Sequence, residues 1–275
     1  MTAIILAAGR GSRLGAVTAA LPKCLLPIGG RVLLDLTLDR VARAGLDRVL
    51  VVTGFEARRV ERHLRRTRPH RLHVELVHNA DHDRTNNLHS LALALARVSG
   101  PFTVINGDDF FNVRILERLL DAPGAAAAAV DLTWPPAPDA MRTTIRDGAV
   151  VRLGKALPIA ETTGNAIGVY RFSGSIAEAL RDELSRRVAA GRVDDFYVAA
   201  IDAIATDGSI AAVSTASLTW GEIDDAADLA AAPSKLARIE AEEAVAAVTS
   251  PRRPAAQRLP SASIFPDHSH VLAPA

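Results

Sequence analysis

The stretch from residue 2 to residue 30 constrains the fold of this chain more than any other. An apolar run, Ala3 to Leu6, has the length and composition of a buried strand, and a segment with three glycines, residues 7–15, follows it directly. Glycine has no side-chain bulk and accepts positive φ, so that backbone N–H groups of such a loop can approach a ligand closely. Arg10 and Arg13 add forked, permanently charged donors. The pattern predicts a phosphate-binding loop after the first strand.

The spacing of these glycines differs from the two most familiar phosphate-binding loops. A dinucleotide fingerprint needs G-x-G-x-x-G, whereas the glycines here are residues 9, 11 and 15. A P-loop ends in Gly-Lys-Ser/Thr, whereas this loop has Gly11-Ser12-Arg13. The remaining alternative is an ordinary strand-to-helix turn with incidental arginines.

The periodicity of apolar residues predicts alternating strands and helices. Strands are expected over residues 3–6, 48–53, 72–77, 102–106, 125–132, 165–172 and 210–214, with a hairpin over 141–153. Helices are expected over residues 32–44, 56–66, 88–96, 175–189, 196–204, 226–232 and 234–248. This order predicts an α/β fold, with a Rossmann-like, mostly parallel mixed sheet and helices on both faces.

Size and charge limit the classes of partner. With 275 residues the chain can form one large α/β domain, and we expect one domain followed by a tail. The net charge is +1, with 32 basic and 31 acidic residues, which gives no overall field for nucleic acid or a membrane surface. The single cysteine, Cys24, fits a reducing compartment, and no signal peptide or membrane span is indicated. We therefore expect a cytoplasmic protein with small-molecule partners.

Two acidic segments follow predicted strands. Asp108 lies just after the strand 102–106, where side chains of an open α/β sheet face the ligand crevice. Hard carboxylate oxygens make it a candidate ligand for Mg²⁺, and Asp224, just before a helix, is a candidate partner from a distant segment. Simple capping of the following helices by these aspartates or their neighbours is the alternative.

Lysine is scarce in this chain. Of the 32 basic residues, three are lysines, at positions 23, 155 and 235. Lysine is expected here mainly where a compact ammonium group cannot be replaced by a guanidinium fork, which singles out Lys23 and Lys155.

Asn86 and Asn87 precede a predicted helix, and their amides can contact a base or ribose, or Asn86 can cap that helix.

Two linked motifs carry a family resemblance. The segments L-A-A-G-x-G-x-R, from residue 6, and P-K-x-L-x-P-I-x-G, from residue 22, resemble the signature of nucleotidyltransferases that activate sugar 1-phosphates and phospho-alcohols. Further segments resemble the branch of phosphocholine, inositol 1-phosphate and 2-aminoethylphosphonate cytidylyltransferases, namely Thr85-Asn86-Asn87, Gly107-Asp108-Asp109, Gly154-Lys155, Ile167-Gly168-Val169-Tyr170 and Glu222-Ile223-Asp224. The resemblance covers residues 2–232.

The resemblance implies a nucleotide-diphospho-sugar transferase type of fold and a Mg²⁺-dependent reaction. CMP would pass from CTP, the favoured NTP, to a small phosphate or phosphonate monoester, with release of pyrophosphate. Arg13, Lys23 and Lys155 would be catalytic, with Lys155 at the acceptor phosphate, and Asp108 and Asp224 would hold the metal. The implied nucleotide-binding residues are Leu6, Ala8, Gly9, Arg10, Gly11, Ser12, Asn86, Asn87 and Asp108.

The resemblance also suggests a division of the chain. Residues 1–232 would form the catalytic domain, with 133–200 mainly binding the acceptor, and residues 233–275 would form a helical extension and a disordered tail. Family members often have Met-Lys, and a Glu shortly before the Ile-Gly step, where this chain has Met141-Arg142 and Asn165. Both departures fall in the acceptor half. A homodimer is compatible with the sequence.

The acceptor is not named by the sequence. A quaternary ammonium group is best held by aromatic faces or a carboxylate, but aromatic residues make up only 4% of the chain. A partial cage can be drawn from Trp134, Tyr197 and Trp220, with Glu161 or Asp194 nearby. Choline is therefore only one candidate for the acceptor's headgroup.

Two other functions fit parts of the sequence. One is a sugar-1-phosphate nucleotidyltransferase that uses UTP, dTTP or GTP, although Asn86-Asn87 replaces the usual Gln…Gly-Thr base loop. The other is a regulatory protein that binds nucleotide without turnover. A sensor need not keep the metal pair, so this second alternative is disfavoured by the joint presence of Arg13, Lys23, Asp108 and Asp224.

Overall fold

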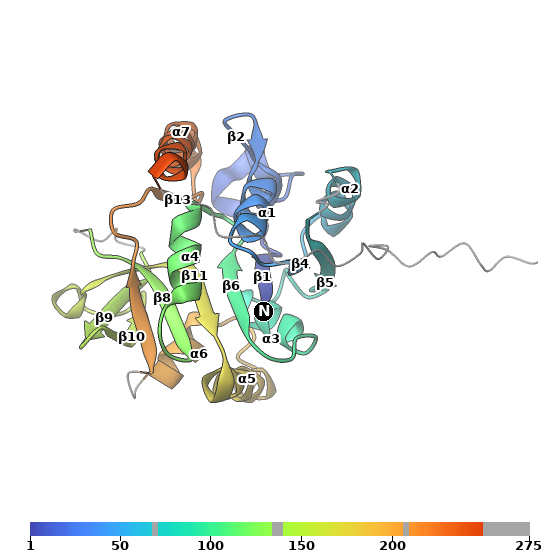
Figure 1. Cartoon of the computed structure of the whole chain (residues 1–275). Coiled ribbons are helices and arrows are strands. Elements are labelled where there is room, and N and C mark those ends of the chain that lie inside the picture. Colours follow the sequence, from blue (N-terminus) through green and yellow to red (C-terminus); the bar gives the residue numbers. More distant parts are fainter. Residues whose placement is uncertain (68–70, 134–139, 206–208, 250–275) are drawn as a thin grey trace, which may run out of the picture.

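A nine-stranded mixed sheet runs through the middle of the molecule, in the order β5-β4-β1-β6-β11-β8-β12-β10-β9 (Figure 1). This computed structural model describes residues 1–67, 71–133, 140–205 and 209–249. The strands are β1 (Thr2–Ala7), β4 (Arg48–Thr53), β5 (His73–His78), β6 (Phe102–Asn106), β8 (Ala126–Asp131), β9 (Arg142–Arg146), β10 (Ala149–Gly154), β11 (Gly164–Phe172) and β12 (Ile210–Ser214).

Strand direction divides this sheet into two parts. Strands β5, β4, β1 and β6 are mutually parallel, and β12 is parallel to β8. Strand β11 is antiparallel to both of its main neighbours, β6 and β8, and the β9–β10 hairpin closes the far edge. The carboxyl ends of β1 and β6 therefore lie side by side, which places the glycine-rich loop next to Gly107-Asp108.

Helices cover both faces of the sheet, because successive side chains of each strand point to opposite sides. Ile4 packs in one apolar cluster with side chains of α3 (Asn87–Leu95), α5 (Gly174–Ala189) and α6 (Val198–Ile204). Its neighbours Ala3 and Ile5 pack in a second cluster with α1 (Leu33–Arg43), α2 (Ala57–Thr67) and α4 (Val113–Asp121). The predicted α/β fold is confirmed.

Several short elements near the carboxyl end of the sheet were not expected from the sequence. Strands β7 (Asp109–Phe111) and β13 (Trp220–Glu222) form an antiparallel pair in which Glu222 lies opposite Asp109. Strands β2 (Pro27–Ile28) and β3 (Arg31–Val32) form a second small pair. The short 3₁₀ helices are η1 (Ser12–Thr18), η2 (Lys23–Leu25) and η3 (Ile159–Glu161). Apart from η1, which has seven residues, these elements have only two or three residues and are too short to show a hydrophobic period.

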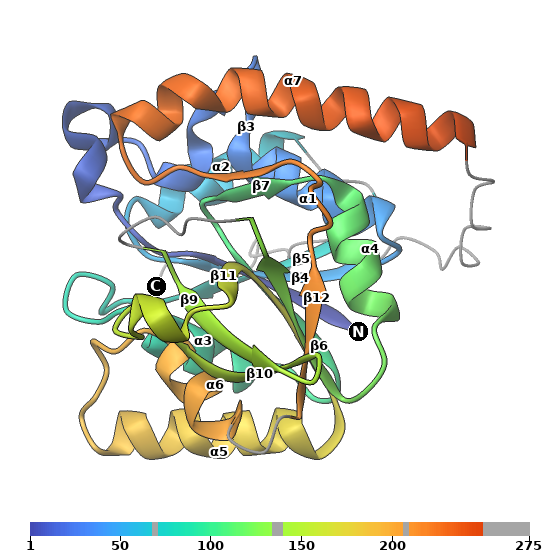
Figure 2. The same cartoon turned by 90° about the vertical axis from the view of Figure 1, so that its left-hand side faces the viewer.

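The last helix, α7 (Ala226–Thr249), is continuous, whereas the sequence suggested separate runs on either side of Pro233. Its Leu236 and Ile239 are buried against Phe110 and Ile223 in a third apolar cluster, and this packing keeps the helix intact despite its internal proline. The expected boundary at residue 232 thus falls inside a helix. Figure 2 shows α7 along one end of the molecule and α5 along the opposite end.

The remaining expectations for this part of the chain concern its tail and membranes. The predicted disordered tail, residues 250–275, lies outside the described residues. None of the helices in the described part of the chain has the length and apolar character needed to cross a membrane.

Candidate active site

The glycine-rich loop after β1 forms one wall of a cleft of about 740 Å³. Gly11 has φ 72°, and a Cβ added there would lie 3.2 Å from the Cβ of Lys23, so that glycine lets the two segments pack closely. Most residues expected to bind the nucleotide line this cleft: Leu6, Ala8, Gly9, Gly11, Ser12, Asn86, Asn87 and Asp108. Arg10 is not among the lining residues, and its guanidinium lies 5.1 Å from the centroid of the Phe55 ring.

Lys23 lies between the two aspartates expected to hold the metal. Its Nζ donates to Asp108 Oδ2 at 2.7 Å and to Asp224 Oδ1 at 2.8 Å, and the side chain is only 12% exposed. Burial alone would lower the pKa of Lys23, but the adjacent carboxylates outweigh it and raise that pKa above 10.5. Arg13 lies 3.2 Å from Asp224 Oδ2. Residues from three distant segments of the sequence thus form one charged cluster.

Glu222 is a third carboxylate in this cluster, and the sequence analysis assigned it no role. Carboxylate oxygens of Asp108, Glu222 and Asp224 all lie within 4.8 Å of one another. Burial and the negative charges of Asp108 and Asp224 raise the pKa of Glu222 to about 8. Such a crowded set of hard oxygen donors fits a divalent cation like Mg²⁺, whose charge would relieve the repulsion. The signal was the Glu-Ile-Asp spacing, because residues two apart on an extended segment share a side.

Asp109 lies behind this cluster and is 1% exposed. Its Oδ2 has no hydrogen-bond partner among the described residues. Burial raises the pKa of Asp109 well above its ordinary value, and the nearby Asp108 and Glu222 raise it further. Gly168 packs against this carboxyl group: it has φ 79°, and a Cβ there would lie 2.1 Å from Asp109 Oδ2 and 2.2 Å from Asn106 Nδ2. The Ile-Gly step therefore permits a close approach of β11 to the floor of the cleft.

Asn86 and Asn87 have defined structural contacts. Asn86 caps α3, since its side-chain oxygen accepts from the Asn87 backbone N–H at 2.7 Å. Asn87 Oδ1 accepts from the backbone N–H of Tyr197 at 2.9 Å. Both side chains also line the cleft, and their contact with a nucleotide stays a prediction.

Lys155 also lines the cleft. Its Nζ is 5.4 Å from the centroid of the Phe196 ring, and both residues also line a neighbouring cavity of about 540 Å³ together with Glu161 and Asp194. Arg142, where the resemblance led us to expect lysine, donates to the backbone oxygens of Lys155 at 2.7 Å and of Leu157 at 2.9 Å. Arg142 thus holds the loop that carries Lys155.

The aromatic residues proposed for a cage are arranged differently from the expectation. Tyr197 is buried, its ring packs edge-on against Tyr170, and its hydroxyl donates to Asn106 Oδ1 at 2.8 Å, so it offers no open face. Trp220 lines the cleft and donates from Nε1 to Asp131 Oδ2 at 2.8 Å. Trp134 lies outside the described residues. Phe196, which is 43% exposed, is the aromatic residue beside Lys155 that the sequence analysis missed.

This geometry agrees with a family assignment. A family model for the MobA-like NTP transferase domain matches residues 3–254. The chain belongs to the MobA-like NTP transferase family. The resemblance to nucleotidyltransferases that the opening motifs indicated is therefore confirmed.

Curated relatives of this NTP transferase domain include cytidylyl-type enzymes. The CMP-5'-(3-aminopropyl)phosphonate synthase of Streptomyces rubellomurinus is 33% identical over 241 residues, which are 82% of this chain and 37% of that protein. A bifunctional IPC transferase and DIPP synthase of Aquifex aeolicus is 29% identical over 68% of this chain and 42% of its own length. The chain thus spans about two fifths of the length of these two relatives. The CTP:phosphoglutamine cytidylyltransferase of Campylobacter jejuni is 26% identical over 63% of this chain and 73% of its own.

Solved structures confirm the nucleotide-diphospho-sugar transferase type of fold. The CTP:phosphocholine cytidylyltransferase from Streptococcus pneumoniae has a TM-score of 0.72 at 19% identity, over 86% of this chain and 98% of that one. The inositol-1-phosphate CTP transferase from T. maritima has a TM-score of 0.71 at 21% identity, over 87% and 96% of the two chains.

Proposed function

We propose that this NTP transferase is a Mg²⁺-dependent cytidylyltransferase that transfers CMP from CTP to a small phosphate or phosphonate monoester and releases pyrophosphate. The observation that carries the proposal is the charged cluster of Lys23, Asp108 and Asp224 beside a glycine-rich loop in one cleft. The names of several relatives favour the cytidylyl group and a phosphate or phosphonate acceptor. A cytoplasmic location, where nucleoside triphosphates are made, goes with this proposal.

The proposed reaction needs no protein nucleophile. A phosphate or phosphonate oxygen of the acceptor attacks the α-phosphorus of CTP in line, a new P–O bond forms, and the bond to the β-phosphate oxygen breaks as pyrophosphate leaves. Catalysis then depends on positioning the two anionic substrates and compensating their charge. Backbone N–H groups of residues 8–13 and the guanidinium of Arg13 would bind the triphosphate.

Charged residues from several segments line the cleft. Lys23, already desolvated beside Asp108 and Asp224, would compensate charge at the reacting phosphates. Asp108, Asp224 and the neighbouring Glu222 would hold Mg²⁺, which when bound polarises phosphate oxygens as a Lewis acid. Lys155, which also lines the cleft, would bind the acceptor's anionic group, and Arg142 would keep its loop in place.

The proposal is tested by measuring pyrophosphate release with Mg²⁺ over a grid of substrates. CTP, UTP, GTP, dTTP and ATP are each combined with phosphocholine, 2-aminoethylphosphonate, inositol 1-phosphate and glucose 1-phosphate. Turnover with CTP and a non-sugar acceptor is the expected result. Turnover only with a hexose 1-phosphate and another nucleotide would instead assign the sugar-activating alternative.

A variant separates the enzyme from a nucleotide sensor. Asp108→Ala should lose turnover while CTP still binds through the glycine-rich loop, measured by calorimetry. A wild-type protein that binds nucleotide but turns over none of the substrate pairs would favour the regulatory alternative.

A further inference from the structure

All three lysines of the chain line the same cleft, including Lys235 of α7, to which the proposed mechanism gives no role. The other 29 basic residues are arginines. Lys23 is held by Asp108 and Asp224, whereas the ammonium group of Lys235 makes no hydrogen bond or ion pair within the described ranges. An unpaired cation at the wall of a cleft lined by phosphate-binding groups suggests that its partner is an anionic ligand.

The position of Lys235 is fixed close to the acidic cluster. A Cβ added to Gly221 would lie 3.1 Å from Lys235 Cδ, so the aliphatic part of the lysine passes next to β13 at the residue before Glu222. Lys235 nevertheless forms no ion pair with Asp108, Glu222 or Asp224 among the described contacts. The acidic cluster therefore accounts for Lys23 but leaves the charge of Lys235 available.

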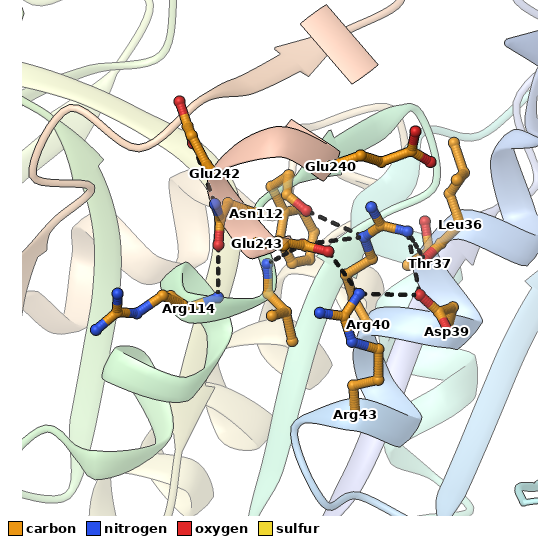
Figure 3. Close-up of polar contacts among 12 residues, drawn as sticks. Leu36, Thr37, Asp39, Arg40, Arg43, Asn112, Arg114, Glu240, Glu242 and Glu243 are labelled. Atoms are coloured by element: carbon orange, nitrogen blue, oxygen red, sulfur yellow. Dashed lines mark hydrogen bonds and ion pairs between the residues drawn. The ribbon is translucent and has the colours of Figure 1, made fainter. Parts of the chain in front are cut away.

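The helix that carries Lys235 is anchored directly after this residue and again further along. Leu236 and Ile239 are buried with Phe110 and Ile223. Further along, Glu243 Oε1 accepts from the backbone N–H of Val113 at 2.8 Å. Figure 3 shows this contact region, where Glu243 faces Arg40 and Arg43 of α1. Because apolar packing and polar contacts both hold α7, Lys235 is presented to the cleft by a rigid element.

We propose that Lys235 binds a phosphate or phosphonate oxygen of a substrate in this cleft, so that α7 is part of the active site. The inference rests on the proposed function, since it assumes phosphorylated substrates. The anion is the triphosphate of the nucleotide or the anionic group of the acceptor, and the two sources share the chemistry that an ammonium group recognises.

The test compares Lys235→Gln and Lys235→Arg with a matched control, Arg238→Gln. Arg238 is on the same helix and exposed, and among the described residues its one ion pair is with Glu242, at 3.2 Å. We expect Lys235→Gln to weaken the binding of one of the two substrates by roughly tenfold or more, which is the effect of losing a charge-assisted hydrogen bond. Lys235→Arg should restore part of that loss, and all three variants should melt within a few degrees of the wild type.

Steady-state kinetics distinguish the two sources of the anion. If the variant raises the KM for the nucleotide alone and binds inorganic pyrophosphate more weakly, the anion that Lys235 binds is the triphosphate. If the variant raises the KM for the acceptor alone, that anion is the anionic group of the acceptor. Values of KM, kcat and binding within about twofold of the wild type for both substrates would overturn the proposal.

Direct binding keeps this test separate from the proposed function. If the wild-type protein turns over no substrate pair, the proposed function fails, but calorimetric titration with inorganic pyrophosphate and with inorganic phosphate still compares wild type and Lys235→Gln. Weaker binding of either anion by the variant then supports the role of Lys235. Equal binding of both anions contradicts it.

Discussion

The carboxyl groups of Glu222 and Asp224 both line the cleft and are two positions apart in the sequence, but their neighbours give them different protonation states. Burial alone would raise the pKa of Asp224, but hydrogen bonding and charge from Lys23, with Arg13 nearby, hold it below its ordinary value. Partial burial and the negative charges of the neighbouring Asp108 and Asp224 raise the pKa of Glu222 to about 8. In the metal-free protein Asp224 is thus ionised at neutral pH, whereas Glu222 largely keeps its proton.

The pKa of Glu222 predicts how the stability of the metal-free protein depends on pH. The unfolded chain releases this proton near 4.5 and the folded protein near 8, so that the folded state binds the extra proton between those values. The contribution of Glu222 to the free energy of unfolding is therefore full below 4.5 and falls as pH rises toward 8, by at most about 1.4 kcal/mol per pH unit. Glu222→Gln should flatten this decline.

Urea denaturation with a chelator, at several values between about pH 5 and pH 8, measures the slope. Glu178→Gln, which alters an exposed glutamate on α5, is the control and should keep the wild-type profile. Parallel profiles for wild type and Glu222→Gln would contradict the raised pKa.

Gly168 supports a second prediction at the scale of one residue. An alanine Cβ there would collide with Asp109 and Asn106, and the left-handed backbone adds strain. We expect Gly168→Ala to lower the free energy of unfolding by about 3 kcal/mol or more. Gly148→Ala is the matched control, because Gly148 has φ 76° but nothing within 4 Å of the added Cβ, and it should lose only about 1 kcal/mol. Equal losses in urea denaturation would show that the contact with Asp109 does not matter.

At the scale of elements, sequence patterns predicted the long strands better than the short ones. The strands over 48–53, 102–106 and 210–214 are confirmed at both ends, because apolar side chains of a strand covered on both faces form continuous runs. Strands β7 and β13 are too short for such a pattern and depend on pairing across distant segments. Pro233 suggested a helix break, but tertiary packing of Leu236 and Ile239 overrides the local propensity.

In the candidate site, too, residues in local sequence motifs could be predicted, whereas contacts between distant segments could not. Motif residues such as Lys23 and Asp108 could be selected from the chain, because loops at strand ends carry recognisable spacing. The role of Glu222 depends on the β7–β13 pairing, and the position of Lys235 depends on how α7 packs. The Glu-Ile-Asp spacing is a local signal, but the β7–β13 pairing and the packing of α7 join distant segments, so the sequence alone predicted neither contact. The burial of Tyr197 was missed for the same reason.

The contact between α7 and the body of the protein gives a prediction at this scale. Arg40 is 2% exposed, and Glu243 is its buried acidic neighbour, at 3.7 Å from Nε to Oε1. Glu243→Ala removes that negative charge and the acceptor of the Val113 N–H, so we expect a loss of about 3 to 5 kcal/mol in the free energy of unfolding. Glu240→Ala, one turn earlier and 50% exposed beside Arg31, should change it by less than about 0.5 kcal/mol.

Denaturant titration of the two glutamate variants measures this difference. A small effect of Glu243→Ala, similar to that of Glu240→Ala, would mean that the polar contacts of Figure 3 do not anchor the helix.

At the scale of the whole molecule, the cleft joins the two ends of the described chain. The glycine-rich loop and Lys23 come from the first residues, and Glu222, Asp224 and Lys235 come from the last segments. Helix α7 also covers an apolar surface formed by β2, α1 and β7, through the third cluster. Folding of the N-terminal part and assembly of the site are therefore coupled to the C-terminal helix.

This coupling predicts that a chain ending at Ala232, the boundary expected from the sequence, will not form a stable cleft. It would lose Leu236 and Ile239, uncover Phe110, and leave Arg40 without Glu243. Two buried apolar side chains stabilise by about 1.5 to 3 kcal/mol each, and breaking the buried pair adds several more, a sum comparable with the whole stability of a domain. A chain ending at Thr249, which retains all of α7, is the control. Calorimetric melting should give a cooperative transition for the control and none, or a much lower one, for the shorter chain. Equal melting and equal pyrophosphate binding by both chains would instead place the end of the catalytic unit before α7 and would remove Lys235 from the site.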